Sequence, residues 1–458
     1  MTRRDADPAL QDAEPAVFWL DRPDRPAARD PLDGPAEADL AVVGGGFSGL
    51  WTAVLAKQRD PGRDVVLLEA ERIGWAASGR NGGFCSSSLT HGHENGVRRF
   101  PGEIDLLEQL GTQNLAAIER TVTSAGIDCD FRRAPSLSVA TEPYQVEDLR
   151  AGPGAFLDRE QVQAAVRSPT YLAGLRTTGD LALVDPARLA WGLARLAASL
   201  GVRVHERTPV TGLRREGGRV RVTTASGDVL ARSVALGTNA FPSLLRRTRL
   251  HTVPVYDHVL VTEPLSAAQR AAVGWDGGEG VDDLANQFHY YRQTADGRIL
   301  WGGYDAVYHY GRQVRARYDQ RPATSATLSR HFFATFPQLE GLRFTHRWGG
   351  AIDTCTRFCA FYGTSHGGRV AYVLGYTGLG VGASRFGAEV VLDLLSGEPT
   401  ALTRLEMVRR RPVPFPPEPL AYAGISLTRR SLAKADRSEG RRDLWLRTLD
   451  RLGLGFDS

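Results

Sequence analysis

Near the start of the chain, short continuous runs of apolar residues flank a stretch in which apolar residues recur at helical spacing. A short apolar run at 39–43 precedes a stretch with helical periodicity at 47–58, and a continuous Val/Leu-rich run follows at 64–69. Short, continuous apolar runs are typical of strands buried in a parallel sheet. The pattern therefore predicts a strand–helix–strand unit of about 30 residues, the size of one mononucleotide-binding half.

Later segments predict more helices and strands. Apolar residues at helical spacing predict a helix at 104–124, and Asp185 followed by Pro186 predicts an N-capped helix that stops at Gly201. A Pro-rich linker and short basic helices are expected beyond residue 411. The predicted strands lie at 202–205, 210–214, 219–224, 229–236, 254–262, 298–302 and 371–375, and a helix at 384–395 follows the last of them.

Composition narrows the class of protein. At 458 residues the chain exceeds one ordinary domain and suggests two interleaved ones. A hydrophobic content of 42% and a net charge of +4 exclude a disordered chain and give no strong field for nucleic acid. Four scattered cysteines and a polar start favour a reducing cytoplasm. Glycines interrupt the longest apolar run, 40–56, so a strand–turn–helix fits it better than a membrane span.

The first strand–helix turn carries a candidate dinucleotide site. Gly44, Gly46 and Gly49 match the spacing G-x-G-x-x-G, and Glu69 ends the next strand. The glycines allow a tight turn, close approach of a pyrophosphate and close helix packing, and the helix N-terminus favours an anion. Glu69 can accept hydrogen bonds from ribose hydroxyls. The alternative is an ordinary glycine-rich turn.

Two further glycine-rich loops favour FAD over NAD. The loop 74–83 directly follows the ribose-binding strand and supplies the polar side chains of Arg80 and Asn81, so it can contact a ligand as long as a flavin dinucleotide. The loop 375–382 leads into another helix, whose N-terminus would stabilise negative charge on a reduced flavin.

These blocks resemble the D-amino-acid-oxidase/glycine-oxidase superfamily of FAD enzymes, and within it the gamma-glutamylputrescine-oxidase-type branch. They cover most of the chain and are more specific for the superfamily than for the branch. The matching segments are VVGGGFSGLWTA (42–53), VVLLEAERIGWAASGRNGGF (65–84), ALGTNAF (235–241), DGRILWGGYD (296–305), WGGAID (348–353) and GYTGLGVGASRFGAE (375–389).

The resemblance implies an α/β (α+β) fold with two domains. A Rossmann-like FAD-binding domain with a three-layer ββα arrangement would comprise 38–95, 175–245 and 345–400. A substrate domain with a mixed or antiparallel sheet would comprise 96–174 and 246–344. We expect residues 1–37 to form an extended arm that docks through Phe18 and Trp19, and residues 401–458 to form the linker and a basic helical tail.

The motifs and the resemblance together assign the cofactor contacts and imply non-covalent FAD. Some relatives attach the flavin to a histidine after the second strand or to a cysteine near Trp348, and this chain has neither at those places. Oxygen-using relatives hold a lysine over the flavin where this chain reads Ile299-Leu300-Trp301, so O2 and another electron acceptor both stay open. The predicted contacts are Gly44, Gly46, Phe47, Ser48, Gly49, Glu69, Ala70, Gly79, Arg80, Asn81, Gly82, Gly83, Val210, Gly237, Thr238, Gly378, Leu379, Gly380 and Val381.

The implied reaction moves a hydride from the carbon beside an amine nitrogen to the flavin, and the imine is then hydrolysed to a carbonyl compound and an amine. Tyr256 and His258 are candidates for substrate contact because period two places them on one face of a strand. Tyr290 would attract an amine through cation–π contact, Arg292 would bind a carboxylate, and Trp348 begins a glycine turn near the flavin.

Two other functions remain open from the sequence. The first is FAD-dependent oxidation of a 2-hydroxy acid or alcohol, in which His258 would be the base, and the second is a flavin-binding protein without activity. The expected partners are a small amine or amino acid, an electron acceptor and, as a possibility, a second copy of the chain. The histidines are dispersed along the chain, so we expect no metal site. The basic tail is expected to dock on its own body or a second subunit rather than on a membrane.

Overall fold

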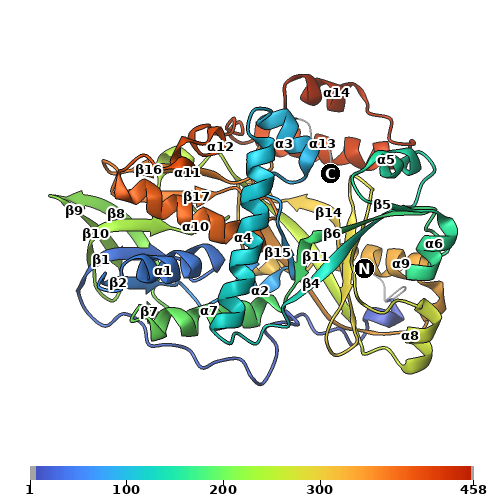
Figure 1. Cartoon of the computed structure of the whole chain (residues 1–458), viewed down its shortest axis with the longest axis horizontal. Coiled ribbons are helices and arrows are strands. Elements are labelled where there is room, and N and C mark those ends of the chain that lie inside the picture. The colour runs from blue at the N-terminus through green and yellow to red at the C-terminus, as the bar shows by residue number, and fades with distance from the viewer. Residues whose placement is uncertain (1–6, 455–458) are drawn as a thin grey trace.

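The computed structural model describes residues 7–454, which form two β-sheets lying side by side (Figure 1). The first six residues of the predicted arm and the last four of the predicted tail lie outside the described residues. No helix between residues 7 and 454 combines the length and the apolar character that a membrane span requires.

The first sheet has eight strands, six of them in the order β16-β17-β10-β1-β2-β7, with the β8–β9 hairpin attached through β9 to β10. The neighbours β17, β10, β1, β2 and β7 pair in parallel, as the strand–helix–strand pattern predicts. The strands are β1 (Ala36–Val43), β2 (Val65–Leu68), β7 (Arg203–His205), β8 (Val210–Glu216), β9 (Arg219–Thr224), β10 (Val229–Leu236), β16 (Phe361–Ser365) and β17 (Val370–Leu374).

Both faces of this sheet are covered, which confirms the three-layer ββα arrangement. Leu40 and Val42 of β1 pack into the core formed with α1 (Phe47–Arg59), α7 (Pro186–Ser199) and α10 (Gly380–Ser396). Ala41 and Val43 face the opposite side, where the β8–β9 hairpin contributes its valines. Asp185 caps α7 as predicted, because its Oδ1 accepts the N–H of Arg188 at 2.9 Å.

The second sheet has nine strands in the order β15-β11-β14-β13-β12-β4-β6-β3, with β5 attached to β6. It is a mixed sheet, because β12 and β4 pair in parallel while the other neighbours are antiparallel. The strands are β3 (Phe84–Ser86), β4 (Arg132–Ala140), β5 (Ala155–Leu157), β6 (Ala173–Leu183), β11 (Val253–Thr262), β12 (Gly280–Asp283), β13 (His289–Gln293), β14 (Ile299–Tyr308) and β15 (Phe344–Thr354).

The two sheets divide the chain differently from the predicted domain boundaries at several points. The strands β3, β6 and β15 come wholly or mostly from the stretches assigned to the FAD-binding domain, yet they pair into the second sheet. Conversely, α4 (Ile104–Ser124) comes from a stretch assigned to the substrate domain but packs into the same core as α1 and α10. The chain therefore crosses between the two bodies more often than the predicted boundaries allow.

Shorter helices lie around these two bodies. The helix 384–395 that the sequence predicts begins four residues earlier, at Gly380. The remaining helices are α2 (Ala77–Arg80), α3 (His93–Arg99), α5 (Gln145–Ala151), α6 (Arg159–Ala165), α8 (Ala267–Val273), α9 (Pro322–Thr335), α11 (Ala401–Arg404), α12 (Glu406–Arg409), α13 (Leu420–Asp436) and α14 (Leu444–Arg451), with single 3₁₀ turns at Pro8–Leu10, Arg246–Thr248, Ala316–Tyr318 and Pro337–Leu339.

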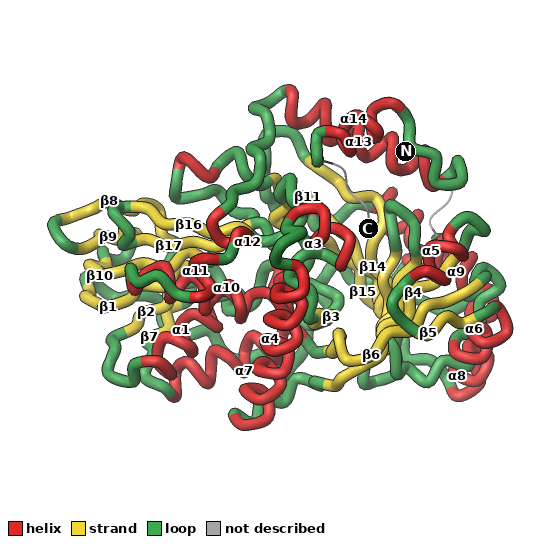
Figure 2. The backbone as a smooth tube through the Cα atoms, turned by 45° about the horizontal axis from the view of Figure 1, so that its top comes forward, coloured by secondary structure: helices red, strands yellow, loops and turns green. Residues whose placement is uncertain are grey.

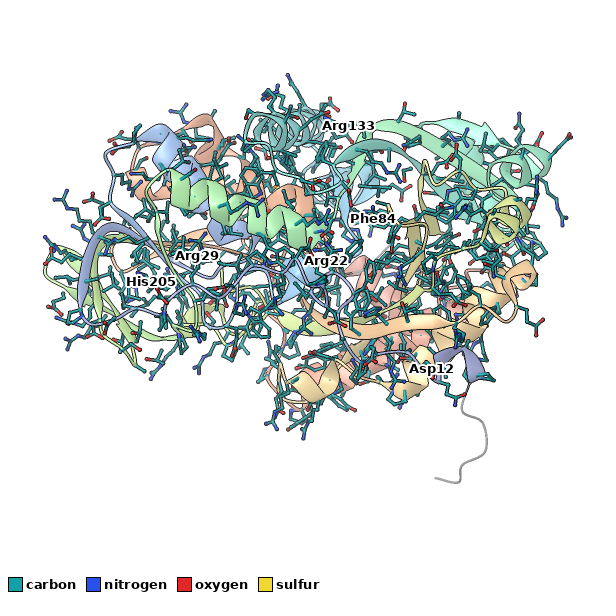
Figure 3. All side chains as sticks on the ribbon, turned by 90° about the horizontal axis from the view of Figure 1, so that it is seen from below. Asp12, Arg22, Arg29, Phe84, Arg133 and His205 are labelled. Carbon is teal, nitrogen blue, oxygen red and sulfur yellow. The ribbon has the colours of Figure 1, made fainter. Side chains whose placement is uncertain are left out.

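The N-terminal arm runs along the underside of the molecule from the second sheet to the first, as Asp12, Arg22 and Arg29 mark in Figure 3. Arg22 forms a 2.6 Å ion pair with the buried Asp185 of the α7 N-terminus. Trp19 is buried, and its Nε1–H donates to the carbonyl of Asn81 at 2.9 Å. Docking through the predicted aromatic pair therefore ties the arm to the second glycine-rich loop.

The C-terminal segment turns back over the opposite side of the molecule (Figure 2). There α13 and α14 lie between α3 of the first body and α5 of the second, above the region where the two sheets meet. The predicted basic tail thus docks on its own chain.

Candidate active site

One cavity of about 1490 Å³ runs between the two bodies, and it receives residues from both sheets and from the C-terminal segment. Pockets for single small ligands usually hold about 300–1,000 Å³. The larger volume leaves room for a dinucleotide and a second molecule in one space. Most predicted cofactor contacts line it: Gly44, Gly46, Phe47, Ser48, Glu69, Ala70, Arg80, Asn81, Gly82, Val210, Gly237, Thr238, Gly378, Leu379, Gly380 and Val381.

The first glycine-rich turn is shaped by close backbone contacts. Gly44 has a φ of +111°, and a Cβ there would lie 2.6 Å from the carbonyl oxygen of Gly237. A Cβ on Gly49 would lie 1.9 Å from the carbonyl oxygen of Gly44, so Gly49 allows α1 to pack on the turn without itself lining the cavity. These contacts require glycine for the reason that the fingerprint gives.

The N-terminus of α1 lies at the cavity. Its N-cap is Gly46, and Gly46, Phe47 and Ser48 all line the cavity. The N–H of Phe47 already donates to the Ser78 hydroxyl at 2.9 Å, and the helix dipole and the next amides of the first turn favour an anion. This end of the cavity therefore fits the pyrophosphate of FAD.

Glu69 lies beside this turn with most of its acceptor capacity already used. Its Oε2 accepts the N–H of Gly45 at 2.5 Å, and its Oε1 accepts those of Glu71 at 2.8 Å and of the Trp75 indole at 2.9 Å. Burial is the largest effect and raises the pKa of Glu69 despite these donors. An ionised carboxylate has about four acceptor positions, so one stays free for a ribose hydroxyl.

The second glycine-rich loop holds itself together instead of offering its polar side chains. Arg80 donates to Asp319 and to the carbonyls of Trp75 and Gly349, and Asn81 bonds within its own loop. Gly79 and Gly83 do not line the cavity, because each lies against a neighbouring backbone carbonyl. The Arg80 and Asn81 side chains are therefore already occupied by partners within the protein.

The second helix N-terminus in the cavity is that of α10. Its N-cap, Leu379, forms no side-chain hydrogen bond, and the turn is held from below by Asp353, whose Oδ2 accepts the N–H of Gly375 at 2.5 Å. Burial raises the pKa of Asp353 to about 7. A helix N-terminus here favours negative charge on a bound group, which fits the pyrimidine end of a reduced flavin.

At the other end of the cavity, the structure brings together a phenol and a carboxylate. The Tyr290 hydroxyl donates to Oδ2 of Asp257 at 2.5 Å, and both residues line the cavity. Tyr290 reaches β11 across β14 because Gly302 lies beneath its ring, where a Cβ would be 2.4 Å from the ring. Burial raises the pKa of Asp257 to about 6, and the donors around it act against that rise. Sequence reasoning selected Tyr290 but missed Asp257.

The predicted partners Tyr256 and His258 are separated by the structure. Tyr256 lines the cavity, whereas His258 does not. The register of β11 against β14 shifts between these two residues, so they do not follow simple period-two geometry. The His258 ring packs beneath Gly349 and is 2% exposed, and burial lowers its pKa to about 4. His258 therefore has no access to a substrate in this cavity.

Arg292 and Trp348 also lie outside the cavity lining. The Arg292 guanidinium is buried and donates to the carbonyls of Val184 at 2.7 Å and Gly83 at 3.3 Å, so it ties β13 to the second glycine-rich loop. Trp348 is buried and donates its indole N–H to the carbonyl of Arg80 at 2.8 Å. Both residues support the floor of the cavity from outside.

Acidic residues outnumber basic ones in the cavity lining. Asp257, Asp282 and Asp283 are among them, and burial raises the pKa of Asp282 to about 7. Among residues 7–454, only two guanidinium groups and no lysine line the cavity. Each guanidinium is already paired, Arg80 with Asp319 and Arg429 with Asp305.

All four cysteines are free and buried, and none lines the cavity. Burial raises the pKa of each thiol, most clearly to about 12 for Cys85 and Cys129 and to about 11 for Cys359. Protonated, buried thiols are inert as nucleophiles.

Comparison with known proteins agrees with this arrangement. A sequence model of the family described as "FAD dependent oxidoreductase" matches residues 39–394. The chain is 31% identical to the gamma-glutamylputrescine oxidoreductase of Escherichia coli over 81% of this chain and 86% of that protein. It is 29% identical to a probable oxidoreductase, OrdL, of Rhizobium meliloti over 86% of this chain and 92% of that protein.

Solved structures share the fold at lower identity. The glycine oxidase of Geobacillus kaustophilus superposes with a TM-score of 0.66 at 20% identity, covering 82% of this chain and 99% of that one. The likeness shows that this chain and that glycine oxidase share one fold.

Proposed function

Because the chain belongs to the family of FAD-dependent oxidoreductases and is an enzyme of that family, we propose that it oxidises the C–N bond of a cationic amine that lacks an α-carboxylate. Relatives named for gamma-glutamylputrescine and for sarcosine support C–N oxidation. The observation that carries the choice of substrate is the Asp257–Tyr290 pair in a cavity end without an unpaired guanidinium.

Bound FAD would accept the hydride from the carbon beside the nitrogen. In our proposal the Asp257 carboxylate receives the substrate ammonium and takes its proton, because hydride leaves more readily from a neutral amine. Tyr290 fixes the carboxylate through its 2.5 Å hydrogen bond and offers a ring face to the cation. The rings of Phe84 and Phe288 pack beside Tyr290, and this apolar contact lowers the local dielectric and strengthens the charge interaction.

The distribution of basic groups argues against an α-amino acid. A substrate carboxylate needs an unpaired guanidinium or a comparable donor set. Arg292, the residue that the sequence suggests for this task, lies behind the cavity wall, and the two guanidinium groups that do line the cavity are already paired with aspartates. Oxidation of a 2-hydroxy acid would meet the same lack of a carboxylate-binding group.

We propose that FAD is held without a covalent bond, since no cysteine among residues 7–454 lines the cavity and Trp75-Ala76-Ala77 stands where some relatives carry the attached histidine. His91 is the histidine that does line the cavity, and acid precipitation also reports on a bond to it. Precipitation with acid should then release all yellow colour into the supernatant, and colour retained in the washed pellet would contradict this. We also propose an acceptor other than O2, because neither Lys57 nor Lys434 lines the cavity. The free thiols support a reducing, cytoplasmic location.

The proposal is tested by anaerobic reduction of the purified yellow protein. A panel of primary and secondary amines, α-amino acids and 2-hydroxy acids should bleach the flavin only with amines. Bleaching by α-amino acids or hydroxy acids alone would overturn the choice of substrate. Flavin that no member of the panel reduces, although dithionite does, would favour a binding protein without activity. Admission of air should then reoxidise the flavin slowly.

A further inference from the structure

We propose that the C-terminal segment 413–454 is the specificity wall of the substrate cavity and selects amines that carry an apolar alkyl or aryl group. We call this segment the roof. The inference rests on the proposed amine oxidation, and it adds the chemical class of the group that the amine carries. The roof lies beyond residue 394, where the family match ends.

The roof is fastened to both bodies. At its start, the Thr356 hydroxyl donates to the carbonyl of Val413 at 2.6 Å, and at its end Arg99 of α3 donates to the carbonyl of Gly453. In between, Asp436 accepts hydrogen bonds from the backbone and side chain of Asn286, in the loop between β12 and β13. These hydrogen bonds tie the roof to both bodies, and residues of α13 and α14 line the cavity.

Both roof helices contribute to the cavity lining, and we call their lining residues the cavity face of the roof. In α14 these are Trp445 and Leu449, with Leu452 and Leu454 following the helix. In α13 they are Leu420, Ala421, Ala423, Gly424, Ile425, Leu427, Thr428, Arg429 and Leu432, most of them apolar.

The polar groups on this face are already bonded within the protein. Arg429 forms a 2.9 Å ion pair with Asp305 of β14, and the Trp445 indole N–H donates to the Thr428 hydroxyl at 2.9 Å. The roof therefore offers a ligand mainly carbon surface. Leu420 and Leu452 line the cavity and yet are 63% and 66% exposed, so an apolar group entering there would remove this surface from water.

The roof and the acidic end belong to the same cavity, and together they define an amphipathic substrate. The ammonium group fits Asp257 and Tyr290, and the tail fits the leucines of the roof. The occupant is the substrate itself, because the roof is continuous with the wall that holds the cofactor contacts.

The test measures flavin reduction by a series of linear alkylamines from ethylamine to octylamine. In the wild type kcat/KM should rise about fourfold per methylene until the cavity is filled, the fold equivalent of ~0.8 kcal/mol per buried CH₂. Leu449→Ala and Leu432→Ala should flatten this series and lose about tenfold or more with octylamine, while ethylamine changes less than twofold.

Leu444→Ala is the matched control, since Leu444 is on the same helix as Leu449 but is 75% exposed and outside the cavity. It should leave the series unchanged. Binding is measured separately from turnover with 1,1-dimethylalkylamines, which lack the hydrogen to be transferred, through the shift of the flavin absorbance. Leu449→Ala should weaken binding of the long analogue and leave binding of the short one unchanged. This holds even if turnover by the variant is impaired for other reasons.

Several outcomes would overturn the inference. If kcat/KM of the wild type does not change with chain length, the roof has no role in specificity. The same follows if Leu449→Ala and Leu444→Ala lose kcat/KM equally. In either case the proposed amine oxidation is unaffected. If no amine of any length reduces the wild-type flavin, the proposed function itself fails. FAD content of each variant, read from its absorbance, shows whether a loss comes from the cofactor instead.

Discussion

The two ends of the cavity are built in opposite ways. The dinucleotide end is made mainly of backbone groups: glycines that lie against carbonyls and two helix N-termini, with the Glu69 carboxylate beside them accepting three N–H groups. The substrate end is made of side chains from β11, β13 and the C-terminal helices, which are far apart in the chain. Backbone geometry suits a ligand that all family members share, and side chains suit one that differs among them.

The largest expected effect is at the dinucleotide end. Gly49→Val should abolish FAD binding or folding, because even a Cβ at this position would lie 1.9 Å from the carbonyl of Gly44. FAD content per chain and the melting temperature report the loss. Gly102→Ala is the control, since a Cβ there meets no atom within 4 Å, and it should keep full FAD content. Yellow, stable Gly49→Val protein would refute the close packing described for this turn.

At the substrate end we expect a smaller effect that spares the cofactor. Asp257→Asn should lower kcat/KM for an amine by about 100-fold at pH 8, because an amide neither attracts the ammonium nor takes its proton. Tyr290→Phe should cost about tenfold, since it removes one charge-assisted hydrogen bond. Both variants should bind FAD normally. Equal rates for wild type and Asp257→Asn in single-turnover reduction would exclude a role for this carboxylate.

The pH dependence sharpens the same point. Burial raises the pKa of Asp257 to about 6, so the carboxylate is ionised above that pH and protonated below it. Four groups act against this rise: the Tyr290 hydroxyl, the backbone N–H groups of His258 and Gly303, and the His289 ring. We expect kcat/KM to fall about tenfold per unit below pH 6. In Asp257→Asn this acid limb should disappear, and an unchanged limb would assign it to another group.

Arg292 gives the converse test, because it lies outside the cavity. Arg292→Met should lower the free energy of unfolding by about 1–3 kcal/mol, since the carbonyls of Val184 and Gly83 lose buried donors. The preference for amines over amino acids should stay as in the wild type. Thermal melting of the holoenzyme measures the first effect, and the reduction panel measures the second. If Arg292→Met lost activity only with carboxylated substrates, the prediction would be wrong and Arg292 would have a role in substrate binding.

How far the sequence predicts this molecule follows from how local each signal is. The turn at Gly44–Gly49, the strands on either side and the N-cap of α7 depend on neighbours within a few residues, and they were predicted closely. His258 was misplaced because a register shift between β11 and β14 cannot be seen in the sequence of β11 alone. Asp257 was missed for a related reason, since its partner Tyr290 reaches it only because Gly302 of a third strand leaves room.

The predicted domain boundaries show the same limit. Strand β15 carries a family motif, which favoured its assignment to the FAD-binding domain, but its hydrogen bonds go to β11 of the second sheet. The partner of an antiparallel strand depends on the tertiary structure and cannot be read from the strand's own sequence. A motif indicates only which ligand lies near the strand. The roof carries no family motif; the sequence predicted its Pro-rich start and its basic helices, but not that they line the cavity.

The N-terminal arm has a mechanical consequence. It pairs with β15 near Glu14, holds the floor of the flavin loop through Trp19 and reaches β7 near Arg29, so it stitches both bodies together along one flank. These contacts of the arm resist a hinge-like separation of the two bodies along the flank that it covers. On the opposite flank the two bodies are joined through the roof instead, so the cavity between them is bridged by the N-terminal arm on one side and by the C-terminal segment on the other.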